Sequence, residues 1–307
     1  FPVKDTVVIA SKFLGMAFIC LILTTIPIFV GIIVQTLKGY FKYDLGVYLT
    51  DSYLIGLPDY LQMVMLVFAV HLVVNNKFAG HAAAIGIWLV MLILRGFADY
   101  NFNLFFYSYK PGYTWSDMNG LGHFGEPLFW FNIYWTAWGI FLVLFFSIFF
   151  SRGTENSFKS RWKTAKSRLS SLAPRVSFAF LLLAILSGAY IYQTVVYENG
   201  YLTPEEGTRR QVAYEKQLKK YEGIPQPKYT KVTIQADLYP LERDAYFSAE
   251  VELVNKTEAP IDSIHFNSTS LDDFKVVLNG DTLTHRFPLD YKSRLFQVFG
   301  RKPEREW

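Results

Sequence analysis

The sequence predicts an all-α membrane region of about five transmembrane helices, followed by the start of an extracytoplasmic all-β, sandwich-like domain. Three observations predict this fold class. Long apolar runs rich in Leu, Ile, Val and Phe fill residues 1–200, whereas residues 201–307 are charged and hold no such run. Basic residues gather in one loop between two apolar runs. Towards the C-terminus, apolar residues recur at every second position, which is typical of strands with one solvated face.

Five segments are long and apolar enough to cross a bilayer, because a hydrocarbon core of roughly 30 Å requires about 20 mainly apolar residues in a helix. They are Phe13–Leu37, Tyr53–Val74, Phe78–Leu94, Pro127–Phe150 and Val176–Val196. Buried helices of a large soluble protein would explain one such run but not five. The single cysteine, Cys20, lies in the first segment and excludes an intrachain disulfide.

The loop after the fourth segment predicts the orientation, because cytoplasmic loops carry excess Lys and Arg. Against one acid, Glu155, it contains the basic residues Arg152, Lys159, Arg161, Lys163, Lys166, Arg168 and Arg175. Counting outward from this loop places Lys4, Lys12 and Lys77 inside, and the loops 38–52 and 95–126 outside. Everything after Val196 is then extracytoplasmic. The same basic residues also fit a binding site for anionic lipid or a partner, an alternative to a plain topology signal.

Ionisable residues inside predicted spans are costly in lipid and are therefore candidate functional positions. They are Asp59, His71 and Arg95, with Gln62 as a neutral companion. Asp59 and Arg95 lie near the outer ends of their spans, where they can pair, and His71 lies near an inner end. Because none is at the midplane, an anchoring role at the interface is favoured over a role in transport.

The outer loop at 98–126 is dense in aromatic residues and glycines. Asp117, His123 and Glu126 carry metal-ligating groups, but their spacing matches no standard site, and a histidine beside turn glycines is more often structural. We expect no metal there. The loop is expected to be ordered, either re-entering the membrane or lying on its surface.

Residues 201–227 predict a helix and a proline-containing linker. Thr203-Pro204-Glu205-Glu206 has Thr at the N-cap, Pro at the first helical position and Glu three residues after the cap, which is typical of a helix start. Gly223 and Pro225 end the helix.

Residues 228–307 predict the N-terminal part of an antiparallel β domain. Apolar residues alternate with polar ones over Val232–Leu238 and Ala245–Leu253, and another strand is expected over Ile261–Phe266. Asn279-Gly280 suits the type I′ turn of a hairpin. These four or five strands do not complete a sandwich.

The first residues resemble an element of type-2 ABC exporter permeases. Phe1-Pro2-Val3-Lys4-Asp5, followed by Ser11-Lys12-Phe13-Leu14-Gly15, is similar to the cytoplasmic segment before the third of six spans in that family. The resemblance implies that Pro2, Val3, Lys4 and Lys12 face a separate ATPase subunit. It also implies a second permease half or a dimer. Five following spans are one more than the family needs, so the last is assigned to the attached soluble domain.

Four further stretches resemble bacterial fusions of an ABC permease with an aminopeptidase-N-like zinc metallopeptidase. They are Trp115–His123, Tyr221–Lys228, Asp237–Arg243, and Glu252–Thr257 together with Pro260–His265. With the N-terminal element, the resemblance spans nearly the whole chain. It implies a multi-pass protein of the bacterial cytoplasmic membrane, of which this chain is a fragment.

The residues that carry peptidase chemistry in that family are missing from this chain. The family requires His-Glu-x-x-His on a helix, a downstream Glu as third zinc ligand and a Gly-x-Met-Glu-Asn-type segment. No such motif begins at any of the histidines His71, His81, His123, His265 and His285. We therefore expect no catalytic, cofactor or metal residue here, and zinc only in a part of the parent protein outside this chain.

Two function classes remain, and a third is disfavoured. The first is the permease–peptidase fusion, in which this chain supplies the membrane region and a non-catalytic β domain. The second is a non-enzymatic membrane anchor whose exported β domain binds a partner or the cell envelope. A secondary transporter is disfavoured because midplane charges and internal repeats are missing. Nucleic acid is not an expected partner, since most of the excess charge behind the net +4 lies in one loop.

Overall fold

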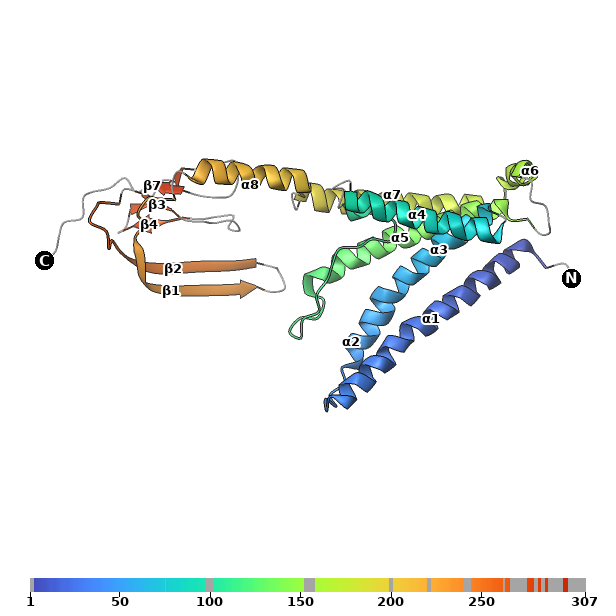
Figure 1. The fold of residues 1–307 in the computed structure, drawn as a ribbon, viewed down its shortest axis with the longest axis horizontal. Coiled ribbons are helices and arrows are strands. Elements are labelled where there is room, and N and C mark those ends of the chain that lie inside the picture. The colour runs from blue at the N-terminus through green and yellow to red at the C-terminus, as the bar shows by residue number, and fades with distance from the viewer. Residues whose placement is uncertain are drawn as a thin grey trace. The chain divides into compact units, whose positions relative to one another are not determined.

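The computed structural model describes residues 3–74, 76–97, 102–151, 158–198, 201–219, 222–239, 244–261, 263–265, 275–278, 281–282, 285–286 and 295–297. The chain forms two compact units, Phe1–Glu205 and Glu206–Trp307. The first unit is helical, and the second contains the strands (Figure 1).

The first unit is built from helices of very different lengths. The long ones are α1 (Asp5–Leu37), α3 (Leu57–Val73), α4 (Lys77–Phe97), α5 (Gly125–Phe146) and α7 (Leu172–Tyr192). The shorter ones are α2 (Leu45–Leu49), the π-helical turn η1 (Thr50–Gly56), α6 (Phe158–Arg168), the 3-10 turns η2 (Asn103–Phe105), η3 (Gly122–Phe124) and η4 (Ser147–Phe149), and the π-helical turn η5 (Gln193–Glu198).

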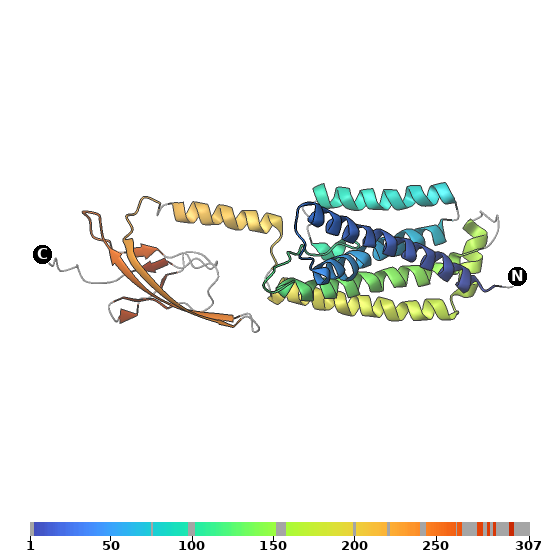
Figure 2. The same cartoon turned by 90° about the horizontal axis from the view of Figure 1, so that it is seen from below.

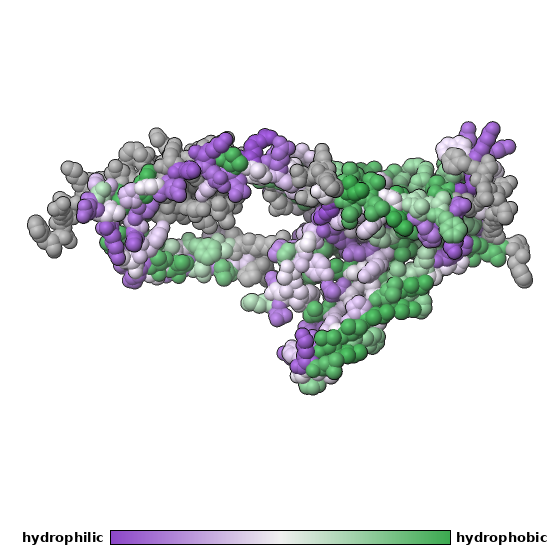
Figure 3. All heavy atoms as spheres, viewed as in Figure 1, coloured by the Kyte–Doolittle hydropathy of each residue, from purple (hydrophilic) through white to green (hydrophobic). Residues whose placement is uncertain are grey.

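Five helical stretches in the described residues are long and apolar enough to cross a membrane: Asp5–Leu37, Leu45–Val73, Lys77–Gly96, Gly122–Phe149 and Leu172–Glu198. The five predicted segments are confirmed as helices. The second starts well before Tyr53 because α2, η1 and α3 follow one another without a break. Hydrophobic side chains cover the visible surface of α1 (Figure 3). The unit is therefore compatible with a multi-pass membrane protein.

Helix α5 packs between α3 and α7, and α3 also contacts α1 and α4 (Figure 2). Small residues permit the close approaches, as is common between membrane helices. A Cβ on Gly188 of α7 would lie 2.8 Å from the Tyr134 ring, and a Cβ on Gly139 of α5 would lie 2.5 Å from Met65 Sδ. Helix α4 contributes little to this packing. In its most apolar 18-residue stretch, 6% of the residues are buried, against 28% in the corresponding stretch that contains α5.

The second unit contains most of α8 (Pro204–Leu218) and three small sheets. Strands β1 (Lys228–Tyr239) and β2 (Asp244–Val254) form a long antiparallel ribbon. The other sheets are formed by β3 (Ser263–His265), β7 (Leu295–Gln297) and β6 (His285–Arg286), and by β4 (Val277–Leu278) and β5 (Asp281–Thr282).

The ribbon confirms the two strands predicted from alternation. Its register places Ile234 opposite Ala249 and Leu238 opposite Ala245, so the apolar positions of both strands share one face. The predicted hairpin is also confirmed, because Leu278 pairs with Asp281. Residues 279 and 280 lie outside the described residues. The described strands form three separate small sheets, and the sandwich-like arrangement is not confirmed.

Candidate functional site

The described part of the connection between α4 and α5, which starts at Phe102, is a loop that packs among the helices. Its Phe102 and Phe106 are buried. The Tyr107 ring meets the Trp135 ring of α5 edge-on at 5.2 Å, and Trp135 Nε1 donates a hydrogen bond of 2.7 Å to the Tyr109 carbonyl. We call residues 102–121 the inserted loop. It lies at the end of the helices opposite α6 (Figure 1).

Gln62 of α3 fastens the inserted loop to α3 and α5. Its side chain is fully buried. Its Nε2 donates to Thr136 Oγ1 at 3.1 Å and to Asn132 Oδ1 at 3.5 Å, while its Oε1 accepts from Ser108 Oγ at 2.9 Å. The Tyr107 hydroxyl donates to the Gln62 carbonyl at 2.9 Å. A buried amide in apolar surroundings is tolerated because its polar atoms are satisfied.

Ser108 has a positive φ of 64°, a conformation that non-glycine residues rarely adopt. In this conformation the Ser108 hydroxyl donates its hydrogen bond to Gln62 Oε1, so the strained residue is also part of the polar network. The combination of strain and a buried polar network marks the inserted loop as a candidate functional element.

Asp59 and Arg95 find partners in the inserted loop instead of each other. Asp59, one turn before Gln62 on α3, forms an ion pair with Lys110. The Arg95 guanidinium lies 4.0 Å from the centre of the Tyr109 ring and donates to Asn103 Oδ1 at 3.3 Å. The expected pairing of Asp59 with Arg95 is therefore wrong, because the loop offers each residue a partner of its own.

The Lys110 side chain is only 6% exposed, although it carries a charge. Burial lowers the pKa of Lys110, and the ion pair with Asp59 opposes that change. Such a pair is costly to separate, since the buried Lys110 ammonium would be left without a counter-charge, whereas Asp59 is partly exposed. The ion pair therefore adds a second attachment of the loop to α3.

Tyr113 attaches the loop to η1 at its exposed edge, where its hydroxyl donates a hydrogen bond of 2.5 Å to Asp51 Oδ1. Burial, the hydrogen bond and the negative charge of Asp51 raise the pKa of Tyr113 to about 12, from an ordinary value of 10.0. The folded protein thus holds this proton to a higher pH than the unfolded chain does. The stabilisation is complete below the unfolded pKa and is lost as the pH rises through the folded one.

Tyr113→Phe should therefore lower the melting temperature at neutral pH, and the deficit should shrink as the pH rises from about 10 to about 12. Thermal unfolding of both proteins in detergent, followed by tryptophan fluorescence across this range, measures the difference. A deficit that stays constant up to about pH 12 would show that the hydroxyl proton is not held by Asp51.

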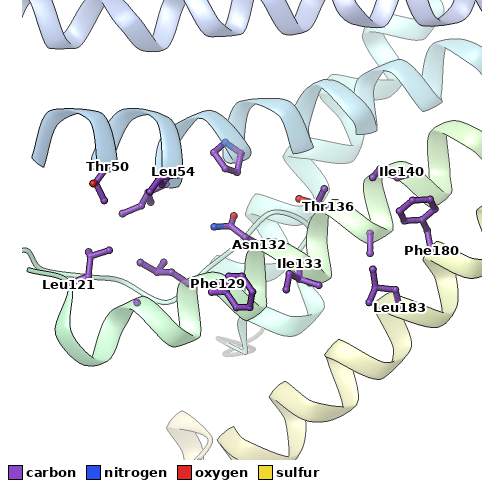
Figure 4. Close-up of a pocket in the computed structure, with 15 residues that line it drawn as sticks. Thr50, Leu54, Leu121, Phe129, Asn132, Ile133, Thr136, Ile140, Phe180 and Leu183 are labelled. Carbon is purple, nitrogen blue, oxygen red and sulfur yellow. The ribbon is translucent and has the colours of Figure 1, made fainter. Parts of the chain in front are cut away.

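A cavity of about 520 Å³ opens between η1, the start of α3, α5 and α7, beside the polar network (Figure 4). Apolar side chains form most of its wall, including Leu54, Phe129, Ile133 and Phe180. Asn132 and Thr136, which hydrogen-bond to Gln62, also line it. An apolar chain with one polar group is the kind of molecule that such a wall accommodates.

At the other end of the helices, α6 lies against the ends of α3 and α5. Arg161 of α6 is 4% exposed, and its guanidinium donates to the Phe149 carbonyl at 2.8 Å and to the carbonyls of Leu72 and Val73. Desolvation by burial lowers the pKa of Arg161. The sequence distinguishes Arg161 in no way from the other six basic residues of this loop.

Arg168, also on α6, connects to α1. Its guanidinium forms an ion pair of 2.9 Å with Asp5 and donates to the Phe150 carbonyl at 2.6 Å. Lys12 lies 5.8 Å from the centre of the Phe150 ring. The start of α1 and the end of η4 are thus joined through one short basic helix.

The remaining predicted residues fall in different places. His71 meets the His81 ring edge-on at 4.6 Å, against Gly80. Val3 and Lys4 are exposed, and Pro2 lies outside the described residues. Within the described part of the chain, no three His, Cys, Asp or Glu side chains gather in a way that could hold a metal. Asp117, His123 and Glu126 form no such group.

Comparison with known proteins gives no match to a family model, a curated protein or a solved structure. Function must therefore be inferred from two features of this chain. One is the inserted loop with its polar network and neighbouring cavity. The other is the basic helix α6, which is bonded to α1, to α3 and to the end of η4.

Proposed function

We propose that this chain is a fragment of an ABC-type membrane permease fused to an extracytoplasmic zinc aminopeptidase. The observation that carries the proposal is the connection at the α6 end of the helices. The segment Val3–Lys12, which resembles the ATPase-facing element of type-2 exporters, includes the first two turns of α1, and Asp5 within it is ion-paired with Arg168 of α6.

This connection suits a protein that is moved by a separate motor. A displacement of the first residues of α1 would be passed by Asp5 to Arg168, and by α6 to Arg161. Arg161 in turn holds the carbonyl ends of α3 and of η4. Because these contacts are hydrogen bonds and an ion pair within a packed helix end, the segment and α6 would move together with α3 and α5.

The cavity and inserted loop supply the transport side of the proposal. The loop closes the helices at the end opposite α6, and its attachments run through Gln62, Asp59 and Asp51. The cavity beside it is mainly apolar. We propose a substrate with a substantial apolar part, admitted between α3, α5 and α7.

An ATPase that carries a nucleotide-binding P-loop should accompany the natural full-length protein during purification in mild detergent. Lys4→Glu should reduce its recovery several-fold, because the exposed Lys4 lies in the segment proposed to face it. Lys163→Glu, an equal charge change on an exposed residue of α6, is the matched control. Quantitative mass spectrometry of the eluate measures the ratio. The permease half fails if no such ATPase is recovered, or if both variants retain it equally.

The peptidase half is tested separately, because this chain holds no His-Glu-x-x-His motif. We expect the motif within a few hundred residues after Trp307 in the natural protein, together with zinc-dependent aminopeptidase activity. If the natural protein lacks the motif, this half of the proposal is wrong and the permease half is unaffected.

One observation favours the second candidate, a membrane anchor whose β domain binds a partner. The β1–β2 ribbon leaves large apolar side chains uncovered, with Ile234 61% and Leu238 64% exposed. In an anchor, a partner would cover this face, whereas in the fusion further parts of the peptidase would cover it. An envelope partner that is lost on Ile234→Glu but retained on Gln235→Glu, in a natural protein without the zinc motif, would support the anchor.

A further inference from the structure

A second cavity lies at the α6 end of the helices, between α1, α3, the start of α4 and α6. Its volume is about 230 Å³. The side chains of Lys12, His71, Lys77 and Arg161 line it, with Asn76 as the remaining polar residue, and no carboxylate is part of the lining. Apolar residues, among them Phe150, complete the wall. The cavity is therefore basic on one part of its surface and apolar on another.

Among the described residues, no acid neutralises the positive charges around this cavity. The Arg161 guanidinium donates its hydrogen bonds to backbone carbonyls and not to a carboxylate. Asp5 on α1 forms its ion pair with Arg168, which does not line the cavity. Within the described part of the chain, Lys12 and Lys77 form no ion pair. Several cations that share a small cavity without a counter-charge favour an anion as its occupant.

The start of α4 strengthens the positive potential. Lys77 is the first residue of α4, and a cation at a helix N-terminus is unfavourable beside the positive end of the helix dipole. Asn76 Oδ1 already accepts hydrogen bonds of 3.0 Å from the amides of Phe78 and Ala79. The anion would therefore be held by the side-chain cations and not by these amides.

His71 offers a further unfilled position. Its Nε2 is buried and has no hydrogen-bond partner in the described structure. A buried ring nitrogen without a partner costs free energy. His71 also lines the cavity, so its ring adds a polar group to the basic part of the wall.

We propose that this cavity binds the phosphate group of an anionic phospholipid headgroup. The cations would hold the phosphate, and the apolar wall formed by residues such as Ile9 and Phe68 would contact the adjoining hydrocarbon. The position fits a lipid, since the cavity is at the end of helices long enough to cross a bilayer. The inference is independent of the proposed permease and peptidase activities.

The test measures binding of soluble short-chain lipids to the purified full chain in a neutral detergent. Dihexanoyl phosphatidylglycerol should raise the melting temperature saturably, and dihexanoyl phosphatidylcholine should do so much more weakly. Lys12→Gln combined with Lys77→Gln should weaken phosphatidylglycerol binding on the order of 10-fold, since each cation near an anionic group contributes appreciably.

The matched control is Lys163→Gln combined with Lys166→Gln, which removes two exposed charges from the same end of the molecule. It should leave phosphatidylglycerol binding within about twofold of the unaltered chain. Equal weakening by both double variants would overturn the proposed site. If inorganic phosphate alone binds with the same sensitivity to Lys12 and Lys77 and displaces the lipid, the occupant is a free phosphate and the lipid assignment is wrong.

Discussion

Arg161→Met is expected to lower the free energy of unfolding by about 3 kcal/mol or more. The substitution keeps an unbranched apolar stem but removes the donors that satisfy the carbonyls of Leu72, Val73 and Phe149. A buried acceptor left without a partner costs about 1–3 kcal/mol, and some water entry would reduce the sum over three. Chemical unfolding in detergent, followed by tryptophan fluorescence, measures the loss.

Two further variants separate hydrogen bonding from charge at this position. Arg161→Lys should recover only part of the loss, because an ammonium group lacks the fork that reaches several carbonyls. Lys163→Met, on the exposed face of α6, should change stability by less than about 0.5 kcal/mol. Stability of Arg161→Met equal to that of Lys163→Met would falsify the view that Arg161 fastens α6 to α3 and η4.

Gln62→Leu is expected to cost about 2–4 kcal/mol and to release the inserted loop from α3. The substitution leaves Ser108, Asn132 and Thr136 without their shared partner in a partly buried place. The Ser108 hydroxyl then has no acceptor in Gln62, so the left-handed backbone conformation of Ser108 loses a hydrogen bond that stabilises it. Faster cleavage of the 102–121 region by a non-specific protease, measured beside unfolding, reports the release of the loop.

Gln35→Leu is the matched control for Gln62→Leu. Gln35 lies on α1, and its Oε1 is buried without a hydrogen-bond partner. Replacing it should be neutral or slightly stabilising, because no partner is orphaned and an unsatisfied polar atom is removed. If the two leucine variants lose the same stability, the network around Gln62 is not what holds the loop.

The secondary structure was largely readable because its signals are local. An apolar run of sufficient length predicts each long helix, and alternation of apolar residues predicts β1 and β2. The second helix was predicted too short at its start, because α2 and η1 contain polar residues such as Asp51 and Ser52 that dilute the apolar run. A search for apolar runs does not detect that the helix continues through such polar residues.

The candidate site was readable only in part. Gln62 stood out as a polar residue in an apolar span, and the spacing of Asn132 and Thr136, four residues apart, would have placed both on one face of α5. The partners of Asp59 and Arg95 were not readable. These partners depend on how the inserted loop turns at Ser108. No sequence motif predicts that this serine adopts a left-handed backbone conformation. Arg161 looked like any other residue of a basic loop, because its burial is a property of tertiary packing.

The sparse packing of α4 has a consequence for how the protein is made. With 6% of the residues in its most apolar stretch buried, α4 leaves nearly all of that stretch uncovered by the other described helices, so lipid or another protein chain would surround it in a bilayer. Near its first turns α4 contacts α3, where the His71 and His81 rings meet. During synthesis, α4 would enter the bilayer as the second helix of a hairpin with α3, without contacts to the other helices. The rest of the membrane region could then assemble around α3 and α5 whether or not α4 had docked.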